Sequence, residues 1–479
     1  MASQTARFRD GYESALDQHF KSLLTDKQLA VPGLVVLARR GDECYHKAFG
    51  MSDLSKGRQM RTDAMFRMYS MTKVMTSFLA LRFYEEGLLD FNDPVSKYIP
   101  SFHREWEVVK DADDGGDWLN YRSMLTGREL QLRYERRPAK QPILIKHLLS
   151  ETSGIEYDLF SEYDFFFGGG VCDRSAGMVA NGLRQQLHED VYRSSNIVGA
   201  ALTLEQFVDT IGRAGVLTCE PGEFSYGHGA TVLGRVLEVV YQGSRGKFCS
   251  FSQIMSELLF EPLGMQDAAF FLADDDPRID RVPTLYGAKL VDDGERTIVL
   301  EEQDCYPDGV ERRLNQHAHY QGPRCYESGD TGAIMTAGDY ARFYDMLLSN
   351  GVSQTGERLL SPQGVRTLCK GRFRDLRLNT QLAKAFGVAG EHSSFPKSFH
   401  FGWATAHGGK HELGGYSTSD HYDMSHWGGY ALTQGFFYLE EDSYMLVCPQ
   451  LMLTTPGAFV FGQKLIRDRS MEVFHSVWA

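Results

Sequence analysis

The stretch FRMYSMTKVMTSFLALRFYEEG, residues 66–87, decides how this chain is interpreted. Its apolar residues recur at the spacing of a helix, and they are Met71, Val74, Met75, Phe78 and Leu79. Gly87 suits the C-terminal cap of such a helix. The pattern predicts a helix from Ser70 to Glu86, with Ser70 and Lys73 on the same face of its first turn.

The tetrad Ser-x-x-Lys occurs three times in the chain, so its context has to separate the copies. Ser244 has a glycine on each side in GSRGK and is expected to follow the end of a helix. Ser394 is followed by Pro396, and proline blocks a helix through that tetrad. Only Ser70 and Lys73 can share one helical turn.

Nucleophilic catalysis by a serine requires a second group close to its hydroxyl, and a shared helical turn would place Lys73 there. A serine hydroxyl is a poor nucleophile until a nearby base takes its proton, and lysine assists only if burial or a neighbouring charge lowers its pKa from about 10.4. At a helix start, backbone N–H groups and the helix dipole can stabilise an oxyanion. The alternative is that Ser70 is an N-terminal cap and Lys73 a solvated charge.

Composition narrows the class of protein. The chain has 479 residues and a formal net charge of −13, which argues against nucleic acid as a partner because phosphates would be repelled. No apolar run approaches the ~20 residues of a membrane span, and the charged N-terminus does not resemble a signal peptide. None of the eight cysteines forms a C-x-x-C pair. These features together predict a cytoplasmic protein with reduced thiols.

The order of elements predicts a mixed α/β architecture. Residues 32–50 are expected to form two strands around a turn, and the middle of the chain is mainly helical. The charged stretch 105–141 is predicted to be a surface excursion with local disorder. After about residue 325, aromatic-rich runs with strand character appear. Strands at both ends with helices between them predict one sheet built from both termini and an inserted helical lobe.

Two further motifs connect this pattern to a known family. The segment EPGEFSYGHGATVLGRVLEVV (220–240) contains Tyr226, and a Trp-Gly-Gly sequence follows at Trp427, Gly428 and Gly429. With Ser70-Met71-Thr72-Lys73, these resemble the three motifs of serine hydrolases of the class C β-lactamase and penicillin-binding-protein type. The nearest branches are the family VIII carboxylesterases and the lovastatin-type acyltransferases. The resemblance covers roughly residues 30 to 450.

The resemblance implies a fold and a mechanism. An α/β lobe with a central antiparallel sheet, from residues 1–85 together with 325–479, would pack on a mainly helical lobe of residues 86–324, as a single catalytic unit. Ser70 would attack a carbonyl carbon and form an acyl-enzyme. Tyr226 would be the general base, with Lys73 as the adjacent cation. The backbone N–H groups of Ser70 and Tyr430 would form the oxyanion hole, and no cofactor is implied.

The departures from the family pattern indicate a substrate class. Trp427 stands where β-lactamases have a lysine that binds the β-lactam carboxylate, which favours a neutral ester and makes the indole an apolar wall. Because His426 precedes Trp427, the register of this motif has an uncertainty of one residue. His228 replaces the usual asparagine and is expected either to contact substrate or to hydrogen-bond behind the site. The segment YESGDTGAIM (326–335) replaces a glycine-rich run.

Three functions remain open at this stage. The leading one is a serine esterase or acyltransferase acting on a small-molecule acyl donor and acceptor. The second is amide chemistry, as in a β-lactamase, D-aminopeptidase or DD-peptidase, and the third is a catalytically silent binding protein. His407 and His411 have a zinc-like spacing but lie among glycines, so no metal site is predicted. The oligomeric state does not follow from the sequence.

Overall fold

The computed structural model describes most of the chain. The described residues are 6–27, 29–112, 114–122, 128–157, 178–180, 183, 203–273, 275–291, 297–302, 327–370, 398–401, 403–406, 412–413, 416–417, 423–453 and 456–479. All structural statements below refer to these residues.

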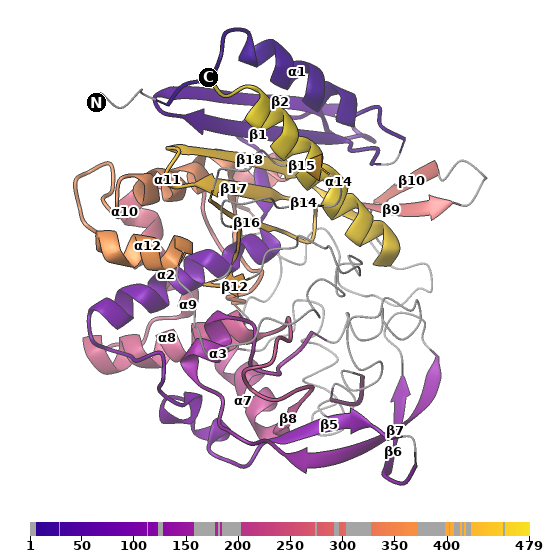
Figure 1. Ribbon diagram of the computed structural model, residues 1–479, viewed down its shortest axis with the longest axis vertical. Coiled ribbons are helices and arrows are strands. Elements are labelled where there is room, and N and C mark those ends of the chain that lie inside the picture. The colour runs from indigo at the N-terminus through magenta and orange to yellow at the C-terminus, as the bar shows by residue number, and fades with distance from the viewer. Residues whose placement is uncertain are drawn as a thin grey trace.

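An eight-stranded sheet is built from both ends of the chain and lies mainly in the upper half of the view in Figure 1. Its order is β12-β13-β16-β17-β18-β1-β2-β3, and adjacent strands are antiparallel. The N-terminal strands are β1 Gly33–Arg40, β2 Glu43–Asp53 and β3 Arg58–Gln59. The C-terminal strands are β12 Ser398–His400, β13 Trp403–Ala406, β16 Met424–Gly428, β17 Gln434–Tyr438 and β18 Ser443–Pro449. The predicted central antiparallel sheet from both termini is confirmed.

Helices cover both faces of this sheet because β1 is apolar on both sides. Val35 and Leu37 belong to one hydrophobic cluster, whereas Leu34 and Val36 belong to another, as the two-residue period of a strand requires. The second cluster is closed by α1 Tyr12–Leu23 and α14 Pro456–Ser476, which lie together over the sheet in Figure 1. The other face packs against α11 Ala337–Leu348.

The helix predicted from the opening stretch is present as α2, Thr72–Glu85, and a single 3₁₀ turn, η1 Tyr69–Met71, precedes it. Gly87 follows with a φ of 71°, a left-handed conformation that glycine adopts without strain. Almost every residue of α2 is buried, including both polar residues at its start, Thr72 and Lys73. The helix therefore runs through the core, and Lys73 is not the solvated charge of the alternative interpretation.

The middle of the chain supplies most of the remaining helices. They are α3 Ile145–Leu149, α7 Leu204–Ala214, α8 Gly229–Arg245, α9 Phe251–Met255, a π-helical turn Ser256–Phe260, α10 Glu261–Leu263 and α12 Pro362–Lys370. Short 3₁₀ turns are η2 Val95–Lys97, η3 Pro100–Phe102 and η5 Pro277–Arg281. Thr203 caps α7, because its hydroxyl accepts from the backbone N–H of Gln206 at 3.1 Å.

The charged stretch 105–141, predicted to be a surface excursion, contains regular strands where the structure describes it. This stretch forms β5 Glu107–Asp111, β6 Asp117–Arg122 and β7 Glu129–Pro138, which make a four-stranded sheet with β8 Val216–Leu217. Its charged residues obscured an alternating apolar face whose members pack as one cluster. They include Val109, Leu119, Tyr121, Leu132 and Tyr134.

Three small sheets complete the structure. β9 Tyr286–Val291 pairs with β10 Thr297–Glu302 and with β19 Leu451–Leu453. β4 Met65–Arg67 pairs with β11 Ile334–Thr336, which brings the segment before α11 next to the start of α2. β14 Glu412–Leu413 pairs with β15 Tyr416–Ser417.

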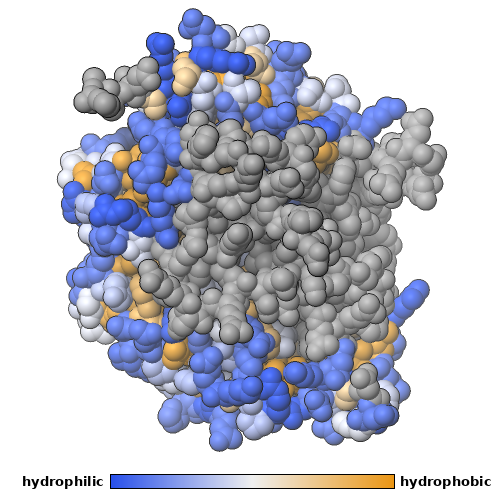
Figure 2. Space-filling model, viewed as in Figure 1, coloured by the Kyte–Doolittle hydropathy of each residue, from blue (hydrophilic) through white to orange (hydrophobic). Residues whose placement is uncertain are grey.

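The described surface is mainly polar. On the face shown in Figure 2, hydrophobic residues are scattered among hydrophilic ones. Among the described residues, the large hydrophobic side chains that are exposed are Leu54, Tyr84, Trp118 and Phe248. They come from separate elements. No helix in the described part of the chain is long and apolar enough to span a membrane.

Candidate active site

Ser70 lies in the short turn between β4 and α2. The residue before it, Tyr69, has a φ of 45°, which is unusual for a residue other than glycine and typical of functional sites. Neighbouring segments hold the turn: the Met68 N–H donates to Ala333 O at 2.9 Å, and the Tyr340 hydroxyl donates to Met71 O at 2.9 Å. Ser70 itself is 9% exposed. A strained and well-supported turn therefore presents the hydroxyl.

Lys73 lies one helical turn further and is fully buried. Its Nζ donates a hydrogen bond to the Tyr157 hydroxyl at 2.8 Å and lies 3.6 Å from Asp330 Oδ1. The same ammonium group stands 4.8 Å from the centre of the Tyr226 ring. A buried lysine needs such partners because an isolated charge in the interior is costly.

Tyr226 reaches the same point from the loop before α8. Trp427 Nε1–H donates to its phenol oxygen at 3.1 Å, and Ser70 lies close enough to influence its pKa. Gly227 makes this approach possible, since a Cβ there would lie 1.9 Å from Ile155 O. The structure thus brings Ser70, Lys73 and Tyr226 together although they come from distant parts of the sequence.

The alternation of β16 places Trp427 and His426 on opposite sides of the strand. Trp427 faces Tyr226, with ring centroids 5.6 Å apart. His426 faces the other side, where its Nε2 lies 3.2 Å from Gln434 Oε1 and its ring stacks on Phe436. Of these two residues, Trp427 is the one that lies on the side of Tyr226, because successive residues of a strand point to opposite faces.

The turn after β16 lies against the segment that carries Ser70. A Cβ at Gly429 would come 2.4 Å from Met68 O, so only glycine allows this approach. The Gly429 N–H donates to Thr433 O at 2.8 Å, and the ring of Tyr430 lies 6.1 Å from that of Tyr69. Gly428 ends the strand opposite Gln434. Trp427, Gly428, Gly429 and Tyr430 therefore border the Ser70 turn.

Comparison with known proteins explains this arrangement. The family model described as Beta-lactamase matches residues 16–450. The chain belongs to the Beta-lactamase family. Protein Rv1367c of Mycobacterium tuberculosis is 28% identical over 68% of the chain, and Esterase EstB of Burkholderia gladioli is 27% identical over 54% of it. The chain covers only 64% and 52% of the lengths of these two relatives.

A solved structure of the same fold is simvastatin synthase (LovD) from Aspergillus terreus. It superposes with a TM-score of 0.66 and 18% identity, covering 98% of this chain and 99% of that one. The β-lactamase-like fold and the predicted resemblance to the esterase and lovastatin-type acyltransferase branches are confirmed.

The protonation states of Lys73 and Tyr226 in this Beta-lactamase family member differ from those that catalysis was expected to require. Burial is the largest influence on Lys73 and lowers its pKa, but Tyr226, Asp330 and Glu151 together raise that pKa to about 12. Burial also raises the pKa of Tyr226, and the nearby Lys73 charge only partly opposes this increase. At neutral pH the resting site therefore holds a protonated lysine and a neutral tyrosine.

Trp427 has a polar role that the sequence did not reveal. It was expected to be an apolar wall, yet its indole N–H donates to Tyr226 and this hydrogen bond lowers the tyrosine pKa. The indole is therefore positioned to stabilise a phenolate while its ring borders the site.

We expect Trp427→Phe to lower kcat/KM for an ester by about tenfold, since one hydrogen bond to a charged oxygen contributes roughly 1.5 kcal/mol. Steady-state kinetics with p-nitrophenyl butyrate would measure it. Trp106→Phe is the matched control, because Trp106 is also buried and donates to the Phe102 carbonyl at 3.3 Å. Equal losses in the two variants would show that the effect is only structural.

His228 lies behind the reacting groups. Its ring contacts Tyr157 edge-on, with centroids 4.6 Å apart, and contacts Phe207 at 5.1 Å. Its Nδ1 lies 3.5 Å from Asp330 Oδ2. Of the two expectations for His228, this position favours an interaction behind the site over direct substrate contact.

Sequence reasoning missed three residues of this Beta-lactamase family site: Tyr157, Glu151 and Asp330. Asp330 lies in the segment that replaces a glycine-rich run, and Glu151 and Tyr157 lie in the loop that follows α3. The available signal was the need of a buried lysine for anionic partners. Nothing in the sequence indicated which carboxylates they would be.

The other candidate residues are not part of this group. Ser244 was expected beyond a helix but lies in the last turn of α8, whose cap Gly246 is left-handed and separates it from Lys247. The tetrad at Ser394 and the histidines His407 and His411 lie outside the described residues. Among described residues, no group of three or more His, Cys, Asp or Glu side chains is suited to a metal ion.

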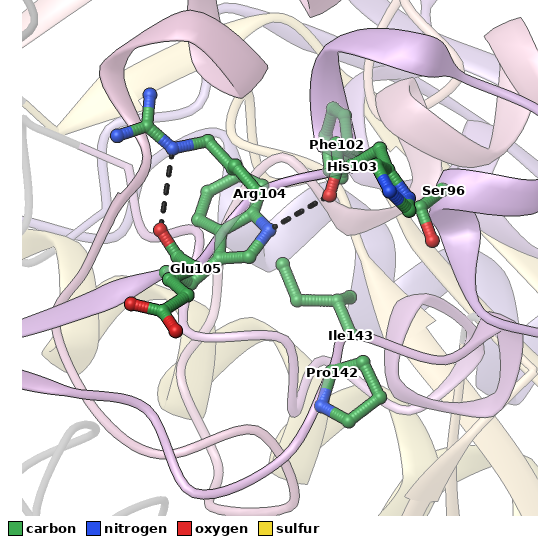
Figure 3. A pocket seen from close by; sticks show the side chains of 8 residues that line it. Ser96, Phe102, His103, Arg104, Glu105, Pro142 and Ile143 are labelled. Atoms are coloured by element: carbon green, nitrogen blue, oxygen red, sulfur yellow. Dashed lines mark hydrogen bonds between the residues drawn. The ribbon is translucent and has the colours of Figure 1, made fainter.

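A separate pocket of about 310 Å³ contains none of the predicted site residues (Figure 3). Its lining residues are Ser96, Phe102, His103, Arg104, Glu105, Trp106, Pro142 and Ile143. Two of its polar groups are already engaged, since Trp106 donates to Phe102 O and Arg104 Nε donates to Glu105 O.

Proposed function

We propose that this protein is a serine hydrolase or acyltransferase that acts on carboxylic esters through an acyl-enzyme on Ser70. The observation that carries the proposal is the convergence of Ser70, Lys73 and Trp427 on Tyr226. The Trp427 indole N–H donates to the Tyr226 phenol oxygen, Lys73 Nζ stands 4.8 Å from the centre of its ring, and Ser70 lies close enough to influence its pKa. The esterase activity named for the relative EstB supports an ester as substrate.

In the proposed mechanism, Tyr226 acts in the form that has lost its proton, beside protonated Lys73. Its phenolate takes the proton of Ser70 Oγ as that oxygen attacks the ester carbonyl carbon. The N–H groups of Ser70 and Tyr430 are the proposed donors to the oxyanion. The ester C–O bond then breaks, and Tyr226 returns the proton to the leaving alcohol. Water or a second alcohol or amine reverses these steps and releases the acyl group.

The charges at the site favour a neutral substrate. Trp427 occupies the position at which β-lactamases carry a substrate-binding lysine, and the buried Lys73 already faces Asp330. Because Lys73 is already paired with Asp330, it would add little binding energy for an anionic substrate. This argues against the alternative of β-lactamase, D-aminopeptidase or DD-peptidase activity.

We expect kcat/KM for p-nitrophenyl butyrate to exceed that for the β-lactam nitrocefin by about 100-fold or more, because the carboxylate of nitrocefin lacks an ion-pair partner worth roughly 3 kcal/mol. Parallel absorbance assays on one preparation would measure the ratio. A nitrocefin value equal to the ester value would favour the alternative activity.

The decisive test of the acyl-enzyme is intact-mass spectrometry after incubation with p-nitrophenyl butyrate, followed by peptide mapping. A single butyryl adduct on the peptide that contains Ser70 is expected. Adding alcohols or amines and measuring their acylated products against free butyrate would then separate transfer from hydrolysis. Failure both to form an adduct and to react with a serine-directed phosphonate would indicate the silent binding protein.

The remaining expectations form part of this proposal. The catalytic unit consists of an α/β lobe from residues 1–85 together with 325–479 and a lobe from residues 86–324, with the site between them. The partners are a small-molecule acyl donor and acceptor, no cofactor or nucleic acid is required, and the location is the cytoplasm. Cell fractionation would test the location.

A further inference from the structure

The environment of Lys73 contains more negative groups than one lysine can balance. Asp330 and Glu151 are both buried, with 0% and 1% of their surfaces exposed. Both carboxyl groups interact electrostatically with the Lys73 ammonium and with each other. If both were ionised, the interior would hold an uncompensated negative charge, which is strongly unfavourable. One of the two carboxyl groups is therefore expected to hold a proton.

Glu151 is held against the chain that carries Tyr226. Its carboxylate oxygen Oε2 accepts a hydrogen bond from the N–H of Gly227 at 2.9 Å, and its carbonyl accepts one from the N–H of Ser225 at 2.8 Å. A Cβ at Gly229 would stand 3.5 Å from Oε2. Glu151 also has a φ of 52°, a left-handed conformation that is costly for glutamate. The fold thus maintains this carboxyl group beside the tyrosine loop despite local strain.

Asp330 is better suited than Glu151 to carry the negative charge. Its side chain accepts from both the N–H and the hydroxyl of Thr231, lies 3.6 Å from Lys73 Nζ, and lies 3.5 Å from His228 Nδ1. Glu151 has one backbone donor, from Gly227. The proton that the cluster retains therefore belongs mainly to Glu151.

The pKa values of Glu151 and Asp330 agree with this assignment of the proton to Glu151 and of the negative charge to Asp330. Burial is the main cause that raises the pKa of Glu151 to about 8, with Asp330 adding to the increase and Lys73 opposing it. Burial also acts to raise the pKa of Asp330, but Lys73 and the hydrogen-bond donors outweigh it, so that pKa lies below its usual value. The groups with which Glu151 shares this cluster are Lys73 on α2, Tyr157, Tyr226, His228 and Asp330.

We propose that Glu151 is a positioning residue that is protonated in the working site and that, once ionised, opposes the loss of the proton from Tyr226. The proposal rests on the function proposed above, in which Tyr226 must lose that proton before it can accept the proton of Ser70. An added negative charge beside Tyr226 makes the phenolate harder to form. Glu151 therefore limits how far the acylation rate rises at alkaline pH.

The test is the pH dependence of kcat/KM for p-nitrophenyl butyrate in Glu151→Gln, between about pH 6 and pH 10. Glutamine keeps an acceptor for the Gly227 N–H and resembles the protonated acid, so below pH 7 the variant should stay within about threefold of wild type. Above the pH at which Glu151 ionises, kcat/KM of the variant should exceed that of wild type by about tenfold. This factor corresponds to a difference of one unit in the pKa of Tyr226.

Glu238→Gln is the matched control. Glu238 is also buried, accepts a backbone N–H from Phe251 at 2.9 Å, and has its pKa raised to about 7, mainly by burial. It pairs with Arg235 through Oε2 at 2.9 Å and is not a member of the Lys73 cluster. We expect this variant to keep the wild-type pH profile. A change that is equal in both variants would overturn the proposal.

Asp330→Asn is the second variant, and it tests the idea if Glu151→Gln does not fold. Removing the Asp330 charge leaves Glu151 as the remaining carboxylate partner of Lys73, so Glu151 should ionise at lower pH. The inflection in the rate profile should then move down by about one pH unit. The proposal would be overturned if the inflection stays at the same pH in Asp330→Asn. It would also be overturned if His228→Asn, and not Glu151→Gln, raises kcat/KM at alkaline pH.

Failure of the proposed function would give a different result. In that case wild type forms no butyryl adduct on Ser70 at any pH, and the inference falls with the function. If the adduct forms but the profiles of Glu151→Gln and wild type coincide at alkaline pH, the function stands and only the role of Glu151 is overturned.

Discussion

Replacing Ser70 by alanine is expected to lower kcat/KM for p-nitrophenyl butyrate by about 10⁴-fold or more, because no covalent intermediate can form without the hydroxyl. The butyryl adduct should disappear from the intact-mass spectrum at the same time. Residual rate, if any, would come from transition-state stabilisation by the remaining groups of the site. Steady-state kinetics and mass spectrometry on the same sample measure both effects.

The control for this variant is the serine of another Ser-x-x-Lys tetrad. Ser244→Ala changes the last turn of α8, where the hydroxyl donates to Tyr241 O at 3.1 Å. It should retain the wild-type rate and adduct. A butyryl adduct that persists in Ser70→Ala, or a loss of activity in Ser244→Ala alone, would contradict the assignment of Ser70 as nucleophile.

Replacing Lys73 by methionine is expected to affect both catalysis and stability. The rate should fall by about 10³-fold, since Tyr226 loses the cation that makes its phenolate accessible. The free energy of unfolding should fall by about 3–5 kcal/mol, because Asp330 remains buried without its ion-pair partner. Urea unfolding at neutral pH would measure the loss of stability.

A double variant separates the two effects of Lys73. Lys73→Met combined with Asp330→Asn removes both members of the pair, so most of the lost stability should return while the activity stays low. Recovery of activity in the double variant would contradict the proposed role of the Lys73 charge. Equal instability of the single and double variants would contradict the energetic coupling to Asp330.

The contributions of Lys73 and Asp330 to the free energy of unfolding depend on pH in opposite directions. The Lys73 pKa is raised, so its contribution is complete below the unfolded value of about 10.4. That contribution disappears as pH rises through about 12. The Asp330 pKa is lowered, so its contribution is present above the unfolded value and is lost as pH falls through the folded value. Unfolding in strong acid should therefore be sensitive to Asp330→Asn.

The local sequence predicted those helices and strands whose formation depends on residues that are close together in the chain. The spacing of apolar residues after Ser70 predicted α2, and the paired runs at 32–50 predicted β1 and β2. Gly87 marked a helix end through its left-handed backbone, which is a property of a single residue. Three motifs in order predicted the family and the group of residues that meet at Ser70.

Residues 105–141 show where local pattern failed. Their charges suggested disorder, but the alternate side chains are apolar and meet a cluster that includes Met178 and Val216. Whether such a strand forms depends on a partner surface, and the sequence of the strand does not describe that surface.

The electrostatic character of the site was decided only by the tertiary structure. Asp330, Glu151 and Tyr157 are brought to Lys73 by packing between α2, the loop before α8 and the β4–β11 pair. Burial then raises the cost of every unpaired charge, so the partners determine which groups keep their protons. The sequence by itself predicted that Ser70, Lys73 and Tyr226 lie together. The distances and burial in the fold decided how that site holds its charge.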